Sequence, residues 1–268
     1  MENRIPTSSR NGNALRVFLT VFIVCAFFSN TYLTTSGASR FGLTAALIEK
    51  GSPEIGDVLP HVISPGWKIK DYAQLDGRIY SEKAPLVSFL ALPVCFAAVR
   101  LGFGLEWVVY FTILFTASLS TALTSVLIYK MVPLWIDDER RRILLALTYG
   151  LGTMALVYGT VFFSHATTAL LCFASFYFLA KMQAGRGGRG LAVLGGAAAG
   201  GAVLSDYFAA ISALCLLGYA AAGRRHLHLV LMGFAVPVAA LLLYNDWVFG
   251  APWPLSYSYS HLYEQLHS

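Results

Sequence analysis

The sequence is short of charge: 12% of its 268 residues are Asp, Glu, Lys or Arg, while 57% are hydrophobic. Soluble domains carry about 25% charged residues. Half that fraction, together with long apolar runs, indicates a polytopic membrane protein. The apolar runs are continuous rather than alternating, which favours membrane-spanning helices over the strands of a barrel.

Cysteine pairs and the common catalytic motifs are also missing. The four cysteines stand singly in apolar runs without a CxxC pair, which argues against a disulfide framework and a zinc site. We find no GxSxG, HExxH, P-loop or dinucleotide-binding motif. The net charge of +5 is modest, and we expect no nucleic-acid partner. Any chemistry would therefore use carboxylates and bases at the membrane surface.

The charge that is present gathers in one segment, residues 34–106. It holds half of the acidic residues: Glu49, Glu54, Asp57, Asp71, Asp76, Glu82 and Glu106. Its basic residues are equally numerous: Arg40, Lys50, Lys68, Lys70, Arg78, Lys83 and Arg100. The polar centre of the segment is 71–85. We expect the function to lie there, the alternative being a solvated connector.

Seven apolar stretches are expected to cross the membrane. They are 17–33, 107–129, 143–160, 161–180, 190–205, 207–222 and 229–247. The first follows a basic N-terminus and reads as an uncleaved span rather than a signal peptide. Residues 190–222 would measure about 50 Å as one helix, too long for a bilayer core of about 30 Å, so we break them near Asp206.

The apolar run at 84–102 is ambiguous, because it contains Pro85 and Pro93 and is barely long enough to span. Treating it as an interfacial helix places the basic loops 130–142, 181–189 and 223–228 on one side together with the N-terminus. The positive-inside rule then makes that side the cytoplasm. We read 40–50 as a second interfacial helix, ended by Gly51.

The predicted architecture is therefore all-α: a single domain, 1–268, forming a helix bundle of about seven spans. Its long first extracytoplasmic loop, 34–106, carries juxtamembrane helices. On this topology Asp71, Asp76, Tyr80, Glu82, Lys83, His165 and Asp206 all lie at the outer face. Ionisable groups at membrane depth are functional hypotheses by default.

Three of these residues, His165, Asp206 and Asp76, also have a structural interpretation. His165 could simply bond a backbone carbonyl, and Asp206 could mark an exposed turn. Asp76-Gly77 is a common turn dipeptide. The charged run 137–142 is expected to be a solvated cytoplasmic loop.

Several stretches together resemble the bacterial GT-C glycosyltransferases, relatives of protein O-mannosyltransferases and lipid A aminoarabinose transferases. The similar stretches are Arg40-Phe41 through Gly51, Asp71, Asp76-Gly77-Arg78-Ile79-Tyr80-Ser81-Glu82-Lys83-Ala84-Pro85, Phe162 through Ala166, and Tyr244-Asn245 through Pro252. The resemblance covers 17–260. It implies a bacterial inner-membrane enzyme that takes a polyprenyl-phosphate sugar donor at the extracytoplasmic face and transfers the sugar to an acceptor.

Two departures from the family matter. Many members carry an acidic residue just after the first span, where this chain reads Ser36-Gly37-Ala38-Ser39. Members also continue with several more helices, whereas this chain stops at Ser268. We therefore expect a chain truncated at its C-terminus, with a second chain as one source of the missing helices.

The resemblance and the chemistry assign roles to seven residues. Asp71 is the preferred catalytic base and Asp76 the second choice, because the usual carboxylate is absent; His165 would orient donor or acceptor. Arg40, Arg78 and Lys83 would stabilise the leaving phosphate, with Tyr80 between the last two. A divalent cation held by Asp71, Asp76 and Asp206 is left open. The alternatives are a non-catalytic transferase remnant and a polyprenyl-lipid-binding or transport protein.

Overall fold

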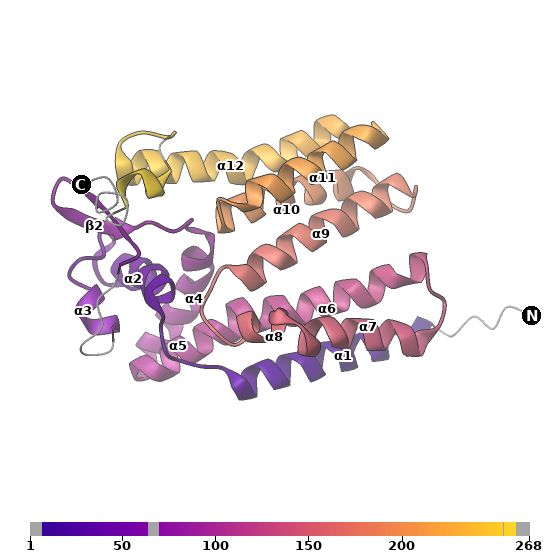
Figure 1. Cartoon of the computed structure of the whole chain (residues 1–268), viewed down its shortest axis with the longest axis horizontal. Coiled ribbons are helices and arrows are strands. Elements are labelled where there is room, and N and C mark those ends of the chain that lie inside the picture. Colours follow the sequence, from indigo (N-terminus) through magenta and orange to yellow (C-terminus); the bar gives the residue numbers. More distant parts are fainter. Residues whose placement is uncertain (1–6, 64–69, 254, 261–268) are drawn as a thin grey trace, which may run out of the picture.

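The computed structural model describes residues 7–63, 70–253 and 255–260 as a helical bundle with a small polar layer at one end (Figure 1). The α-helices are α1 (Thr7–Phe28), α2 (Thr35–Lys50), α3 (Leu59–Val62), α4 (Leu86–Arg100), α5 (Leu105–Ile113), α6 (Leu119–Met131), α7 (Glu139–Gly152), α8 (Met154–Gly159), α9 (His165–Gln183), α10 (Arg189–Ser205), α11 (Ala209–Gly223) and α12 (Leu227–Phe249). A π-helical turn, Leu114–Ser118, joins α5 to α6, and short 3-10 turns lie at Val132–Leu134 and Ser256–Tyr259.

Three helices in the described part of the chain are long and apolar enough to cross a membrane: Asn11–Phe28, Leu105–Met131 and Leu227–Phe249. Three shorter helices, α4, α10 and α11, are also apolar. These lengths and compositions support the prediction of a helical membrane protein.

The surface of α1 is suited to lipid. Its exposed side chains Leu15, Leu19, Ile23 and Phe27 recur every four residues, while Ala14, Val17, Val21 and Cys25 on the other face are buried. Residues four apart lie on one face of a helix. A continuous apolar stripe of this length is unfavourable in water, and lipid removes that cost.

The predicted span 143–160 is wrong as a single helix. The structure breaks it at Thr153, whose hydroxyl accepts a hydrogen bond from the backbone N–H of Ala155 and so begins α8. The charged run 137–142 is likewise not a simple loop. Asp138 caps α7 by accepting from the backbone N–H of Arg140 and Arg141, and the Arg142 side chain is only 2% exposed.

The predicted break near Asp206 is confirmed, because α10 ends at Ser205 and α11 begins at Ala209. Helices α10 and α12 pack closely along the small-residue run of α10. A Cβ atom added to Gly196 would lie 1.9 Å from the carbonyl oxygen of Val230, and one added to Gly233 would lie 2.2 Å from that of Val193. Only glycine permits this backbone contact.

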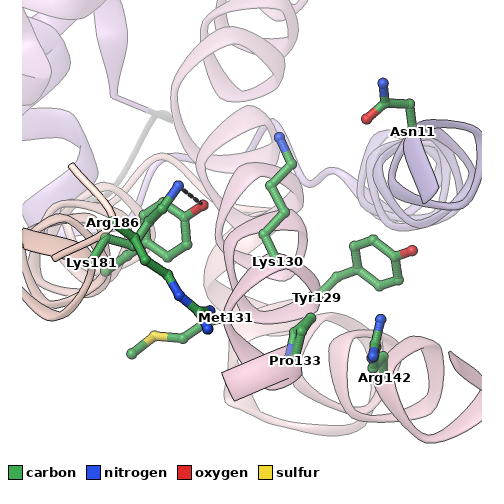
Figure 2. A pocket seen from close by; sticks show the side chains of 9 residues that line it. Asn11, Tyr129, Lys130, Met131, Pro133, Arg142, Lys181 and Arg186 are labelled. Carbon is green, nitrogen blue, oxygen red and sulfur yellow. Dashed lines mark hydrogen bonds between the residues drawn. The ribbon is translucent and has the colours of Figure 1, made fainter. Parts of the chain in front are cut away.

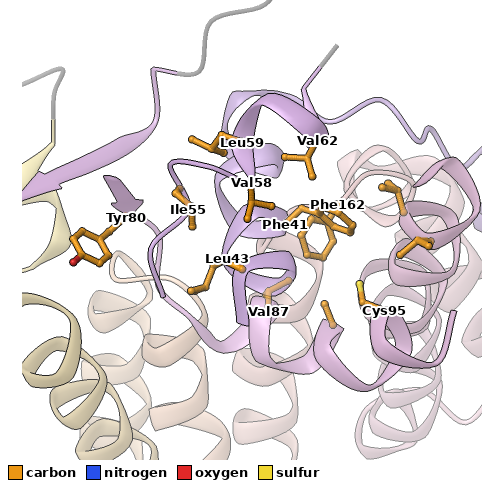
Figure 3. Close-up of a cluster of buried hydrophobic side chains, with 14 of the residues drawn as sticks. Phe41, Leu43, Ile55, Val58, Leu59, Val62, Tyr80, Val87, Cys95 and Phe162 are labelled. Atoms are coloured by element: carbon orange, nitrogen blue, oxygen red, sulfur yellow. The ribbon is translucent and has the colours of Figure 1, made fainter. Parts of the chain in front are cut away.

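The polar layer contains α2, α3 and a β-hairpin, packed with α4 at one end of the bundle (Figure 1). Helix α2 begins earlier than predicted, at Thr35, because the Thr34 hydroxyl accepts from the backbone N–H of Gly37. It ends as predicted at Gly51, which has a φ of 63°. The apolar core beneath it includes Phe41, Leu43, Ile55, Val87 and Phe162 (Figure 3).

The all-α prediction is confirmed, with one short β-hairpin added within the polar layer. Strands β1 (Tyr72–Leu75) and β2 (Arg78–Ser81) pair antiparallel, with Tyr72 opposite Ser81. Asp76 and Gly77 form the two-residue turn with φ values of 50° and 77°. Asp-Gly with two positive φ angles suits a type I′ hairpin, so the turn interpretation of this dipeptide was right.

Helix α4 has one buried face and one exposed face. Val87, Ser88, Ala91, Cys95 and Ala98 are buried, whereas Leu90, Phe96, Val99 and Leu101 are exposed. One face packs against α2 and α5, while the opposite face is largely apolar and uncovered. This is the pattern expected of a helix lying at a membrane interface.

Candidate functional site

The site is built around Asp71, which directly precedes β1. Its Oδ2 atom accepts hydrogen bonds from the hydroxyls of Ser36 and Thr35, in the first turn of α2, the latter at 3.3 Å. The Nζ atom of Lys83 lies 3.4 Å from the same oxygen. The side chain is 17% exposed, so it is largely buried without being sealed from solvent. Asp71 therefore lies against the first turn of α2, beside the stretch Ser36-Gly37-Ala38-Ser39.

Lys83 and Glu82 follow β2 and form a buried ion pair. Lys83 Nζ lies 2.6 Å from Glu82 Oε1, and the two side chains are 9% and 3% exposed. The ammonium group is also 5.2 Å from the centre of the Tyr257 ring. Lys83 thus contacts two carboxylates and an aromatic face, and these contacts fix the position of its ammonium group.

A second group of polar side chains joins α2 to the helical bundle. The Ser164 hydroxyl accepts from Arg40 NH2 at 2.9 Å and donates to Asp206 Oδ2 at 3.1 Å. His165 Nδ1 lies 3.8 Å from the same Asp206 oxygen. Ser164 and His165 begin α9, and Asp206 lies between α10 and α11. Elements far apart in sequence therefore meet at this end of the bundle.

Arg40 connects the two groups electrostatically. It is buried, its NH1 donates to the Ser36 carbonyl oxygen at 3.2 Å, and its guanidinium lies 5.5 Å from the centre of the Phe163 ring. Burial lowers the pKa of Arg40, while the charges of Asp206 and of Asp71 act in the opposite direction. Guanidinium remains protonated under all ordinary conditions, so Arg40 is a fixed positive charge.

The turn Ser256–Tyr259 covers the ion pair from the other side. The Ser256 hydroxyl donates to the backbone carbonyl of Glu82 and lies 3.1 Å from the Tyr207 hydroxyl. Burial raises the pKa of Tyr257, against the opposing effect of Lys83. The phenol therefore stays protonated at neutral pH and can donate a hydrogen bond.

Several buried polar atoms here lack a hydrogen-bond partner within the described residues. They are Arg40 Nε, Glu82 Oε2, the Tyr244 hydroxyl and Asn245 Oδ1. Such atoms cost free energy unless something bonds them. Two of them, on Arg40 and Glu82, belong to the charged groups described above, which is where a polar ligand would find donors and acceptors.

The structure brings together four of the seven predicted residues. Arg40, Asp71, Lys83 and His165 lie within the two connected groups. Asp76 and Arg78 are exposed at the hairpin turn. The Tyr80 ring is buried against the Phe249 ring, with centroids 6.0 Å apart, so it packs against an aromatic side chain rather than between two cations.

The open question of a metal gains no geometric support. No three His, Cys, Asp or Glu side chains among residues 7–63, 70–253 and 255–260 lie close enough together to hold an ion. Asp76, one of the three carboxylates considered, is at the exposed turn instead.

Sequence reasoning missed the hydroxyl side chains of the site: Thr35, Ser36, Ser164, Ser256 and Tyr257. Ser36 was noted only because it occupies the place of a missing acid. Single Ser and Thr residues are too common to stand out in a sequence. The available signal was that Thr35 and Ser36 begin α2 and that Ser164 directly precedes α9.

Comparisons with known proteins add no relative. No family model, no curated protein and no solved structure matches this chain.

Proposed function

We propose that the chain is a membrane glycosyltransferase that moves a sugar from a polyprenyl-phosphate donor to an acceptor at the extracytoplasmic face. The observation that supports this best is the position of Asp71. Its carboxylate is hydrogen-bonded to the first turn of α2, where the similar enzymes carry their acid, and it lies 3.4 Å from Lys83. The stretch 36–39 has no acidic residue, and the Asp71 carboxylate from the following segment lies beside it instead.

The reaction would be a single inverting displacement. The acceptor hydroxyl attacks the anomeric carbon, the new carbon–oxygen bond forms, and the bond from that carbon to the phosphate oxygen breaks. The hydroxyl proton passes to the Asp71 carboxylate, and the electron pair of the broken bond leaves with polyprenyl phosphate. No other reactant is needed.

Asp71 is arranged to accept that proton. The described contacts of its carboxylate all fall on Oδ2: two hydroxyls and the Lys83 ammonium. They hold the carboxylate in one orientation and leave Oδ1 without a hydrogen bond to the described residues. A fixed base with one open oxygen is what general base catalysis requires.

The two buried cations would receive the leaving phosphate. Lys83, just after β2, is held by the Glu82 carboxylate and the Tyr257 ring. Arg40, in the second turn of α2, is held by the Ser36 carbonyl oxygen and the Phe163 ring. A positive charge fixed in a low-dielectric site stabilises developing negative charge more strongly than one in water. The Arg40 Nε atom, which has no partner among the described residues, is available for a phosphate oxygen.

Turnover of donor lipids tests the proposal. Purified protein in phospholipid nanodiscs should release polyprenyl phosphate from at least one member of a panel of polyprenyl-phosphate hexoses and pentoses when membrane extract supplies acceptor. Chain-length-matched polyprenol without phosphate is the binding control. Donor binding without release would favour the non-catalytic remnant, and no binding at all would reject both ideas.

The topology belongs to the same proposal: about seven spans in the bacterial inner membrane, the N-terminus cytoplasmic and 34–106 outside. Its support is that the polar layer lies at one end of the bundle and the basic connections α6–α7 and α9–α10 at the other (Figure 1). Positive loops are retained in the cytoplasm.

Cysteine labelling tests this orientation. Gln74→Cys places a thiol on the exposed side of β1, and Gly188→Cys places one in the α9–α10 connection, where an added Cβ meets open space. In intact cells a membrane-impermeant maleimide should label position 74 above the parent chain and position 188 only after permeabilisation. The reverse pattern would invert the topology and remove the site from the outer face.

A further inference from the structure

A cavity lies at the end of the bundle opposite Asp71. It has a volume of about 430 Å³ and opens between the end of α6, the start of α7 and the end of α9. This is within the size range of small-ligand pockets, about 300–1,000 Å³. Figure 2 shows the side chains that line it. Lys130, Lys181 and Arg186 supply three cations, and the described lining contains no Asp or Glu.

These three cations have no carboxylate partner among the described residues. Lys181 Nζ instead lies 3.3 Å from the Tyr177 hydroxyl, which accepts its hydrogen bond (Figure 2). Lys130 and Arg186 are exposed to solvent at the cavity. Like charges brought close together repel one another, and a shared anion removes that repulsion.

The fourth cation of the cavity, Arg142, is part of its framework. Its guanidinium donates to Ile136 O at 3.0 Å, to Glu139 Oε2 at 3.2 Å and to Asp137 Oδ1 at 2.6 Å. Glu139 in turn accepts from Asn13 of α1 at 2.9 Å. The nearby carboxylates are therefore occupied by Arg142 and do not neutralise the other three cations. The wall is also held in place, joining α1 to α7.

We propose that this cavity binds a phosphate-bearing anion. Phosphate carries enough charge and enough acceptor oxygens to pair with more than one of these cations. Basic pockets between membrane helices at the cytoplasmic side are suited to anionic lipid head groups. The same chemistry is shared by free phosphate from the aqueous phase. The site is separate from the proposed transferase site and does not depend on its activity.

Lipid retention measures this binding. Native mass spectrometry of protein extracted from membranes of phosphatidylglycerol and phosphatidylethanolamine shows which lipid stays bound. Titration with phosphatidylglycerol in nanodiscs of phosphatidylcholine then gives the binding affinity. Replacing Lys130, Lys181 and Arg186 together by Gln should weaken phosphatidylglycerol binding by about 10- to 100-fold at low salt. A parallel titration with inorganic phosphate, at up to millimolar concentration, should displace the lipid if the free ion binds the cavity as well, and should leave the lipid bound if the cavity selects the lipid head group.

The matched control removes three other cations at the same end of the molecule. Arg189, Arg224 and Arg225 are exposed and do not line the cavity. Their joint replacement by Gln should leave lipid binding within about twofold of the parent chain, because their exposed charges are screened by solvent and salt. Equal loss in both triple variants would show a general surface-charge effect and overturn the site. Failure of the parent chain to bind either lipid or phosphate would overturn it as well.

Discussion

Asp71→Asn should lower the rate of sugar transfer by about 10²- to 10⁴-fold, the usual contribution of a positioned general base. The amide keeps the size of the side chain and can still accept from Ser36 and Thr35, but it cannot take the proton of the acceptor. Binding of the donor lipid should stay close to that of the parent chain. The measurement is single-turnover release of polyprenyl phosphate under saturating donor.

Asp76→Asn is the matched control. The side chain is exposed at the hairpin turn with a φ of 50°, and Asn tolerates this left-handed conformation as well as Asp does. Its rate should remain within about twofold of the parent. A large loss at position 76 with full activity at position 71 would move the base to Asp76.

Lys83→Met should destabilise the fold by about 3–5 kcal/mol, the cost of removing one partner from a buried ion pair. Glu82 is 3% exposed and Asp71 17% exposed, so both carboxylates would lose their nearest cation inside the protein. The midpoint of thermal unfolding in one detergent reports the effect. The substitution should also weaken donor binding, because the phosphate loses a charged contact.

A second substitution separates stability from binding. Lys83→Met with Glu82→Gln leaves neither member of the pair charged, so most of the lost stability should return. Donor binding should stay weak, since the ammonium group is still absent. Recovery of both properties in the double variant would mean that Lys83 only neutralises Glu82 and does not contact the donor.

Part of this architecture could be predicted from periodicity and charge. The apolar stretches marked the helices, and the length of 190–222 required the break that the structure has near Asp206. The end of α2 at Gly51 and the Asp76-Gly77 turn followed from local backbone chemistry, since both need residues that adopt positive φ. These features depend on neighbouring residues alone.

The errors had equally local causes. A four-residue strand carries too weak a signal beside a charged loop, so the hairpin was missed. Thr153 divides a stretch that is apolar throughout, and hydropathy does not register a single capping hydroxyl. Arg142 looked solvated within a charged run, but the run winds into a helix that turns this one guanidinium inward.

By itself the sequence determined that this is a helical protein with apolar helices suited to a membrane, because composition and apolar run length limit what can enter lipid. Only the tertiary structure decided which polar residues act together. Asp71 rather than Asp76 lies against α2, because the hairpin points its turn into solvent and returns the chain at Lys83. Arg40, Ser164 and Asp206 meet because three separate helix ends converge, and contacts between distant segments leave no trace in the spacing of one chain.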